Sequence, residues 1–120
     1  MRKQIKLIFQ LGYQVQPDRR HVGFERKLVE AASRMCGGCT ASIKQGWWAD
    51  DGGWHPNRFE VDVIKERCFD LELTCELDEV DRVLEEMRDQ IVKLTGAWKI
   101  QTDWVYVYEV EMTGRHFSIN

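Results

Sequence analysis

The chain opens with a segment in which apolar and polar residues alternate. Residues 3–12 place an apolar side chain at every second position, which is the period of a half-buried β-strand. From residue 22 to residue 35 the apolar residues recur every three or four positions, which predicts an amphipathic helix that Gly37 and Gly38 end. The apolar positions of the strand are Ile5, Leu7, Phe9 and Leu11, and those of the helix are Phe24, Leu28, Ala31, Ala32 and Met35.

A hairpin with a long return strand is predicted next. Residues 40–48 are strand-like, and the segments Ala-Asp-Asp-Gly-Gly and His-Pro-Asn that follow have the composition of turns. Residues 59–75 keep the period of a strand, with apolar residues on one parity and acidic residues on the other, which predicts one buried and one acidic face. Lys65 and Arg67 interrupt the apolar parity. We therefore expect a bend, a bulge or an arm that leaves the core at these residues.

A second helix and a last strand complete the pattern. Asp78 is the expected N-cap of a helix of about four turns that Gly96 closes. Its apolar stripe consists of Val80, Val83, Leu84, Met87, Ile91 and Leu94. The segment from Trp98 to Met112 alternates and is rich in aromatic and β-branched residues, so it is predicted to form a strand.

The predicted order is strand, helix, strand, strand, helix, strand. With right-handed crossovers, this order gives an α+β ferredoxin-like sandwich, in which an antiparallel sheet carries two helices on one face. The 120 residues fit a single domain of this kind. The other face of the sheet needs a cover, and the last strand has aromatic residues on one parity and valines on the other, so both of its faces are expected to be partly covered. We therefore predict a homodimer.

Composition narrows the classes of protein further. The net charge of −3 and the pI near 5.6 argue against direct nucleic-acid binding. Basic residues concentrate in the first third of the chain and acidic residues between 60 and 89, which leaves open a local basic patch and an acidic surface for a partner. No apolar run approaches the roughly 20 residues of a membrane span, and the first residues lack the pattern of a signal peptide. We expect a cytoplasmic protein without membrane association.

Four short motifs follow one another along the chain. They are Gly-Gly-x-Thr, Gly-x-Trp, Asp-Gly and a later Glu, and their residues are Gly37, Gly38, Thr40, Gly46, Trp48, Asp51, Gly52 and Glu66. Over about residues 4–110 the chain resembles a group of small uncharacterised proteins of phages and mobile elements, similar in plan to a bacterial family of unknown function. The resemblance implies a ferredoxin-like fold and a phage origin, and it implies no reaction. Cys36, Cys39 and an extra stretch between residues 53 and 66 depart from the pattern.

Four cysteines are candidates for a redox pair or a metal site. Cys36 and Cys39 have the spacing of a redox pair, but they follow the end of a helix, where the helix dipole disfavours a thiolate. We interpret them as small apolar residues that pack at the turn. Cys68 and Cys75 are an odd number of positions apart in one strand, so their side chains are expected on opposite faces. A four-cysteine zinc site is therefore not predicted.

Catalytic groups are present but not assembled in the sequence. Asp50, Asp51 and His55 carry side chains suited to acid–base chemistry, yet adjacent aspartates in a glycine-rich segment are also ordinary turn residues. The glycines match no P-loop, dinucleotide fingerprint or nucleophile elbow. The sequence predicts no cofactor and no metal, and an enzyme of unknown reaction stays an alternative.

Three tryptophans in one glycine-rich segment are the strongest functional signal. Trp47 and Trp48 are adjacent, so they face opposite sides of a strand, and one of them is expected to pack against the helices while the other covers the open face. Trp54 is harder to bury in this arrangement. An exposed tryptophan at this position is expected to anchor a protein partner, since tryptophan dominates the energetics of interfaces.

Two binding functions follow from this segment. The first hypothesis is a non-enzymatic protein that binds a host protein through the tryptophan segment and the acidic strand face, as a phage-encoded inhibitor of a bacterial defence system would. The second is a protein that binds a nucleotide-like small molecule at a dimer interface, with a tryptophan stacked on the ligand and arginines on its phosphate. The candidate binding residues are Trp47, Trp48, Asp50, Asp51, Trp54, His55, Arg19 and Arg20.

Overall fold

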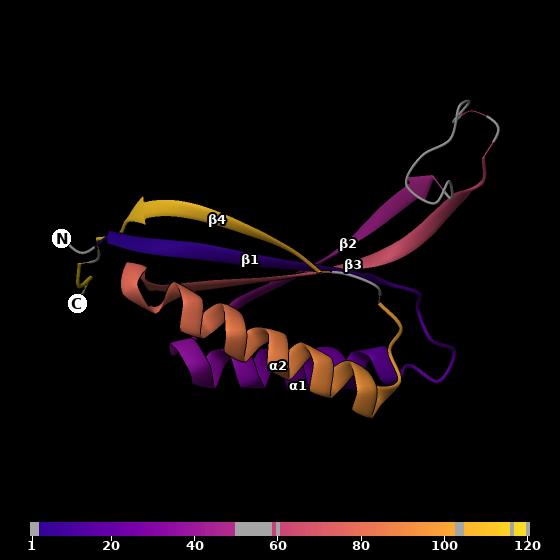
Figure 1. The fold of residues 1–120 in the computed structure, drawn as a ribbon, viewed down its shortest axis with the longest axis horizontal. Helices are drawn as coiled ribbons and strands as arrows, with labels where there is room; N and C mark the ends of the chain where they lie inside the picture. Colours follow the sequence, from indigo (N-terminus) through magenta and orange to yellow (C-terminus); the bar gives the residue numbers. More distant parts are fainter. Residues whose placement is uncertain (1–2, 50–58, 60, 103–104, 116, 120) are drawn as a thin grey trace.

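The computed structural model describes residues 3–49, 59, 61–102, 105–115 and 117–119. Strands and helices follow the predicted order along the chain (Figure 1). The elements are β1 (Lys3–Tyr13), α1 (Arg20–Cys36), β2 (Thr40–Ala49), β3 (Val63–Glu76), the short 3₁₀ helix η2 (Leu77–Glu79), α2 (Val80–Trp98) and β4 (Val105–Thr113). None of the helices in the described residues is long and apolar enough to span a membrane.

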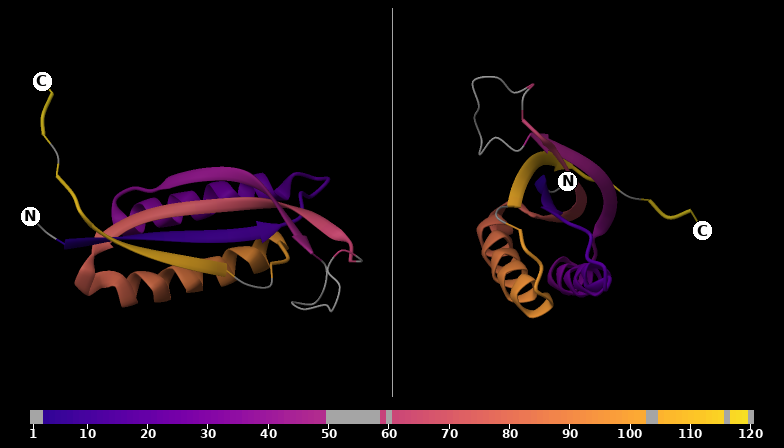
Figure 2. Two further views of the ribbon diagram at one scale, coloured as in Figure 1. Left: turned by 90° about the horizontal axis from the view of Figure 1, so that it is seen from above. Right: turned by 90° about the vertical axis from the view of Figure 1, so that its right-hand side faces the viewer.

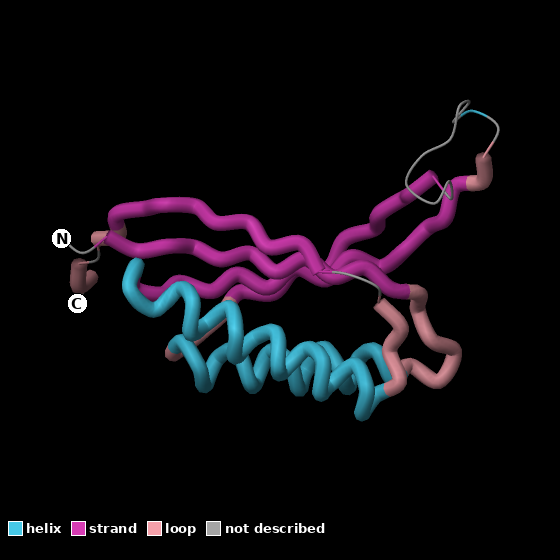
Figure 3. Tube along the Cα trace, in the orientation of Figure 1, coloured by secondary structure: helices cyan, strands magenta, loops and turns pink. Residues whose placement is uncertain are grey.

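The four strands form one antiparallel sheet in the order β2-β3-β1-β4. Both helices lie side by side on one face of this sheet, as the end-on view in Figure 2 shows. Figure 3 shows the same two layers, with the strands above the helices. A sheet with strands 1 and 3 in the centre and two helices on one face is the ferredoxin-like plan. The predicted fold class is confirmed.

The core lies between the sheet and the helices. The alternating positions of β1 that the sequence predicted to be buried are 0–5% exposed, and the register pairs Leu7 with Leu73 and Leu11 with Phe69. The helix residues that meet them are Phe24, Leu28, Ala32, Val83, Met87 and Ile91. Burial of each large apolar side chain contributes roughly 1.5–3 kcal/mol, which makes this contact between layers the main source of stability. Gly37 ends α1 with a φ of 84°, a left-handed conformation that favours glycine.

The start of α2 differs from the prediction. Asp78 lies within η2, and α2 begins at Val80. Glu79 occupies the N-cap position and makes no side-chain capping hydrogen bond. The predicted Asp78 cap is wrong because the chain turns through a 3₁₀ helix before the α-helix starts, which places the aspartate too early.

The end of α2 also differs from the prediction. The helix continues past Gly96 to Trp98, and Lys99 ends it with a φ of 53°. The reason is a tertiary contact, since the Trp98 ring packs on Gly23 of α1, where an added Cβ would lie 2.5 Å from the ring. The predicted last strand therefore begins at Val105 rather than at Trp98.

The second face of β3 is acidic only in part. Cys68 and Asp70 have the parity of this face, yet they are 5% and 6% exposed. Asp70 accepts a hydrogen bond from Lys44 Nζ at 3.1 Å through Oδ2, and its Oδ1 has no hydrogen-bond partner among the described residues. The predicted division into an apolar and an acidic face holds for the parity of β3, and the acidic face is buried at its centre, where β1 and β2 flank β3.

The face of β4 that points away from the helices is exposed in the part of the chain that the structure describes. Tyr106, Tyr108 and Val110 share the parity that faces away from the helices, and they are 51%, 50% and 46% exposed. The rings of Tyr106 and Tyr108 lie 6.3 Å apart, so they form one continuous aromatic surface. The cover of this face was expected from self-association, so both the cover and the homodimer stay predictions.

Candidate functional site

One end of the sheet extends beyond the helices. The pairing of β1 with β3 ends at Tyr13 and Arg67, whereas β2 and β3 continue to pair with each other. We call this two-stranded part, residues 46–49 and 63–66, the hairpin arm, and Figure 1 shows it rising away from the helix layer. Of the bend, bulge or arm expected at Lys65 and Arg67, the structure shows the arm, which begins directly beyond the pair of Tyr13 and Arg67.

Trp47 and Trp48 lie on opposite faces of the hairpin arm. Trp47 has the parity of the helix side but is 57% exposed, so the expected packing of one tryptophan against the helices is wrong, because the arm rises away from the helix layer. The ammonium nitrogen of Lys65 lies 5.8 Å from the centre of the Trp47 ring, within cation–π range. Trp48 lies beside Gly46 on the other face, where a Cβ at Gly46 would be 2.7 Å from the sulfur of Cys68. Because Gly46 has no side chain, the sulfur of Cys68 occupies the space that a Cβ would need.

The other predicted site residues do not join the tryptophans in the described part of the chain. Four of them lie outside the described residues: Asp50, Asp51, Trp54 and His55. Arg19 has a left-handed φ of 61° before α1. Arg20 donates hydrogen bonds to Asp18 and to the backbone oxygen of Lys99, each at 3.1 Å, and thereby joins the start of α1 to the end of α2. The predicted phosphate contacts of these arginines stay predictions.

A buried polar cluster lies where β1 ends and the arm begins. Arg67 donates two parallel hydrogen bonds to the carboxylate of Glu25, from Nε at 2.7 Å and from Nη2 at 2.8 Å. The hydroxyl of Tyr13 donates a short hydrogen bond to the same carboxylate. Tyr13 and Glu25 are only 2% and 5% exposed. A buried carboxylate needs such partners, so the cluster ties α1 to both central strands.

The charge states of this cluster follow from its surroundings. Burial raises the pKa of the Tyr13 hydroxyl above its ordinary value, and its hydrogen bond to Glu25 raises it further, so the tyrosine stays a neutral donor. The hydrogen bond to Glu25 raises the pKa of Arg67. Burial lowers the pKa of the neighbouring His21, as does the charge of Arg67. His21 Nδ1 accepts a hydrogen bond from the backbone nitrogen of Gln16 at 3.2 Å, as a neutral imidazole does.

Arg67 also lines a concavity of about 640 Å³ at the base of the arm. The residues around it are Gln14, Val15, Ile43, Lys44, Gln45, Lys65, Glu66 and Arg67. Gln14 donates a hydrogen bond to the backbone oxygen of Lys65 at 3.0 Å, which holds the chain after β1 against the arm. Glu25 accepts hydrogen bonds from Nε and Nη2 of Arg67. A guanidinium held by a buried carboxylate, next to a lysine, is a donor set suited to an anion.

The cysteines behave as packing residues. Cys36 and Cys39 pack against the core, as predicted. None of the four cysteines, all of which lie in the described residues, forms a disulfide. Burial raises the pKa of the Cys36 thiol, which disfavours the thiolate that redox exchange needs. Cys68 and Cys75 face opposite sides of the sheet, also as predicted. The described residues contain no cluster of three or more His, Cys, Asp or Glu side chains that would hold a metal ion.

Sequence reasoning did not find Tyr13, Gln14 or Glu25. A signal for them was present, because Lys65 and Arg67 stand at apolar positions of a strand. A cation at such a position requires a buried counter-ion, and Glu25 lies beside Phe24 on the buried side of α1. The pairing itself depends on how α1 crosses the sheet, which the sequence pattern does not specify.

Comparisons with known proteins support the fold and do not identify the chain. No family model and no curated protein matches it. Among solved structures, a phage SAM lyase in the apo state is 11% identical, covers 95% of this chain and 92% of its own, and has a TM-score of 0.50. The B. subtilis GlnK–ATP complex is 14% identical over 92% of this chain and 84% of its own, with a TM-score of 0.49. At such identities the likeness concerns the fold alone, and the strand order with two helices on one face defines the class as a small ferredoxin-like α+β protein.

Proposed function

We propose that this protein binds a small anionic ligand with an aromatic group, of the nucleotide class, in the concavity at the base of the hairpin arm. The observation that carries the proposal is the Arg67 guanidinium, fixed by Glu25 at the edge of the concavity beside Lys65. Guanidinium and ammonium groups bind phosphate, the first through its fork of donors and the second as a point charge. The proposal assigns the phosphate contact to Lys65 and Arg67.

The aromatic part of the ligand is assigned to Trp47. Its ring is 57% exposed and lies next to Lys65, which lines the concavity. Stacking of a base on an exposed aromatic ring contributes about 1–3 kcal/mol and tolerates different bases. A ligand that places phosphate near Lys65 and a base on Trp47 would bridge the two groups.

Isothermal titration calorimetry with ATP, AMP, adenosine and inorganic phosphate tests this proposal. We expect ATP to bind more tightly than AMP or adenosine, and Lys65→Gln to weaken ATP binding by about tenfold, the loss of one charged hydrogen bond. Lys93→Gln is the matched control, because it removes the same charge from an exposed position on α2. Absence of heat with every compound, or equal losses in the two variants, would contradict the proposal. Turnover of a bound nucleotide would instead indicate an enzyme.

A protein partner on the hairpin arm is the second candidate function. The arm and the strand leading to it expose Ile43, Trp47 and Val63 at 54%, 57% and 63% on one parity. Exposed apolar and aromatic side chains on a projecting element are typical of interface anchors. A host protein bound by a phage-encoded inhibitor of bacterial defence is one form of this hypothesis.

Pull-downs from a bacterial extract test this second candidate. If the tryptophan segment anchors the partner, Trp47→Ala or Trp54→Ala removes a captured protein that the wild type retains. Val22→Ala, a change at an exposed position of α1, serves as the control and should leave capture intact. Equal capture by all four proteins would exclude the tryptophan segment as the anchor.

A further inference from the structure

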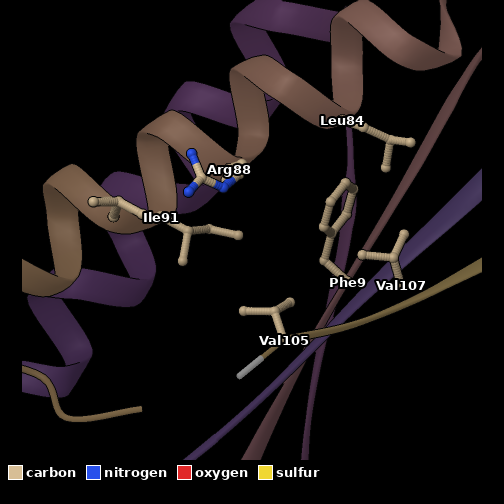
Figure 4. A pocket seen from close by; sticks show the side chains of 7 residues that line it. Phe9, Leu84, Arg88, Ile91, Val105 and Val107 are labelled. Carbon is tan, nitrogen blue, oxygen red and sulfur yellow. The ribbon is translucent and has the colours of Figure 1, made fainter. Parts of the chain in front are cut away.

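A second hollow lies on the helix side of the sheet, away from the hairpin arm. It is an apolar groove of about 360 Å³ between α2 and the edge strand β4 (Figure 4). The residues that matter for its character are Phe9, Leu84, Arg88, Ile91, Val92 and Val107. Val92 and Val107 are 60% and 39% exposed, so the groove is open and apolar at its surface.

Acidic residues surround the continuation of this groove. Glu109 and Glu111 share the parity of Val107, which faces the helices, and both are exposed. Glu85 is exposed on α2, one turn before Arg88, and Arg88 lies 3.9 Å from the carboxylate of Asp89. The groove is therefore apolar, with Arg88 as the one charged side chain among the described residues of its lining and Glu85, Glu109 and Glu111 as acidic residues near its edge. A segment that combines apolar and basic residues is complementary to it.

The segment after β4 has this composition. Phe117 and Ile119 are 84% and 90% exposed, which is unfavourable for two large apolar side chains near each other. Residues 113–120 include Arg115 and no acidic residue. Figure 2 shows the described part of this tail leaving the body of the molecule beyond the end of β4.

The reach of the tail toward the groove of its own chain is limited. The strand from Val107 to Thr113 runs away from the groove and spans about 20 Å at the rise of an antiparallel strand. Phe117 is four residues beyond Thr113, and a fully extended chain of that length covers at most ~14 Å. The backbone of Phe117 therefore falls short of Val107 even if the tail folds back, and within one chain only Ile119, six residues beyond Thr113, has the reach, at most ~21 Å. The tail of a second copy has no such limit and can place both side chains in the groove.

We propose that the tail of a second copy of this chain docks in the groove, with Phe117 and Ile119 against the apolar lining and Arg115 toward the acidic edge. A reciprocal exchange of tails gives a closed dimer with two identical contacts, the commonest symmetry of soluble oligomers. The proposal supplies an interface for the predicted homodimer. It uses none of the residues of the concavity, so its test does not depend on whether the proposed function is correct.

Size-exclusion chromatography with light scattering, over a range of protein concentrations, tests the exchange. The wild type is expected at the mass of a dimer, and both Phe117→Ser/Ile119→Ser and Val92→Glu are expected at the mass of a monomer. Val22→Glu places the same charge on an exposed site of α1 and should remain dimeric. Circular dichroism of each variant checks that it is folded. A monomeric wild type, or a dimer that persists in the tail variant, overturns the proposal.

A peptide experiment tests the groove directly. A fluorescein-labelled peptide of residues 113–120 is titrated with the full-length Phe117→Ser/Ile119→Ser protein, whose grooves are unoccupied under the proposal. We expect saturable binding by anisotropy, weakened about tenfold or more by an added Val92→Glu change, as for an interface hot spot. Binding that Val92→Glu leaves unchanged overturns the assignment. Loss of the dimer in Tyr108→Ser with retention in the tail variant would place the contact on the open sheet face instead.

Discussion

At the scale of single residues, Glu25 is the group whose partners matter most to stability. Its buried carboxylate accepts hydrogen bonds from Tyr13 and Arg67. Glu25→Gln leaves the Arg67 charge without its counter-ion, so we expect a loss of about 3–5 kcal/mol in the free energy of unfolding. Urea denaturation measures it. Glu30→Gln, at a surface position paired with Arg26, should cost under about 1 kcal/mol, and similar losses in both would show that the buried pair has no special role.

His21 predicts a dependence of stability on pH. Burial lowers its pKa in the folded protein, so the unfolded chain binds a proton at a higher pH than the folded one does. The free energy of unfolding should therefore fall as the pH drops from 7 through the ordinary histidine pKa of roughly 6.5. His21→Gln should show a smaller fall over this range, in urea titrations at pH 7 and pH 5. An identical fall in both proteins would assign the effect to other groups.

At the scale of elements, two glycines in the helices predict opposite effects of the same substitution. An alanine Cβ at Gly23 would lie 2.5 Å from the Trp98 ring, whereas one at Gly96 would meet nothing within 4 Å. Gly96→Ala should stabilise by about 0.5–1 kcal/mol through helix propensity. Gly23→Ala should destabilise by about 1–3 kcal/mol, because the Trp98 ring must give up its position on α1 or the helices must separate. Thermal unfolding of the two variants measures the difference, and equal shifts would exclude close packing of α1 on α2 at Gly23.

The elements also show where sequence patterns suffice. The apolar stripes of β1 and α1 predicted their buried faces, because periodicity reflects the one side that each element buries. The patterns failed at both ends of α2, where a 3₁₀ turn precedes the helix and the contact between Trp98 and Gly23 carries it past Gly96. Such ends depend on contacts between elements that are distant in sequence, and no local pattern records them.

At the scale of the whole molecule, the hairpin arm and the sandwich should differ in local stability. The molecule measures 55 × 34 × 30 Å, and the arm projects from the sandwich at one end of the long axis. The arm lacks the helix layer that buries the centre of β1, and a two-stranded ribbon is only marginally stable alone. We expect the paired amides of residues 46–49 and 63–66 to exchange with solvent at least about tenfold faster than those of Leu7 and Phe9. Hydrogen exchange measured by NMR tests this, and uniform protection would contradict it.

The packing of the whole molecule also determines which residues meet in the candidate site. The sequence indicated an unusual tryptophan segment and cations at apolar positions of the return strand. It did not indicate that Arg67 would bond to Glu25, 42 residues earlier in the chain, or that Gln14 and Lys65 would meet at the base of the arm. These contacts exist because β1 pairs with β3 and α1 crosses beneath them.

The amino-acid sequence by itself determined the order of elements, the buried side of each one and the ferredoxin-like class, since these follow from local periodicity and from short right-handed connections. Only the tertiary structure decided that β3 leaves the core as a two-stranded arm rather than through a bend or a bulge, which charges are buried together, and which apolar side chains stay exposed. The physical reason is that periodicity describes an element relative to one generic apolar neighbour. A site requires particular side chains from several elements at hydrogen-bond distance, and the packing of the layers sets those distances.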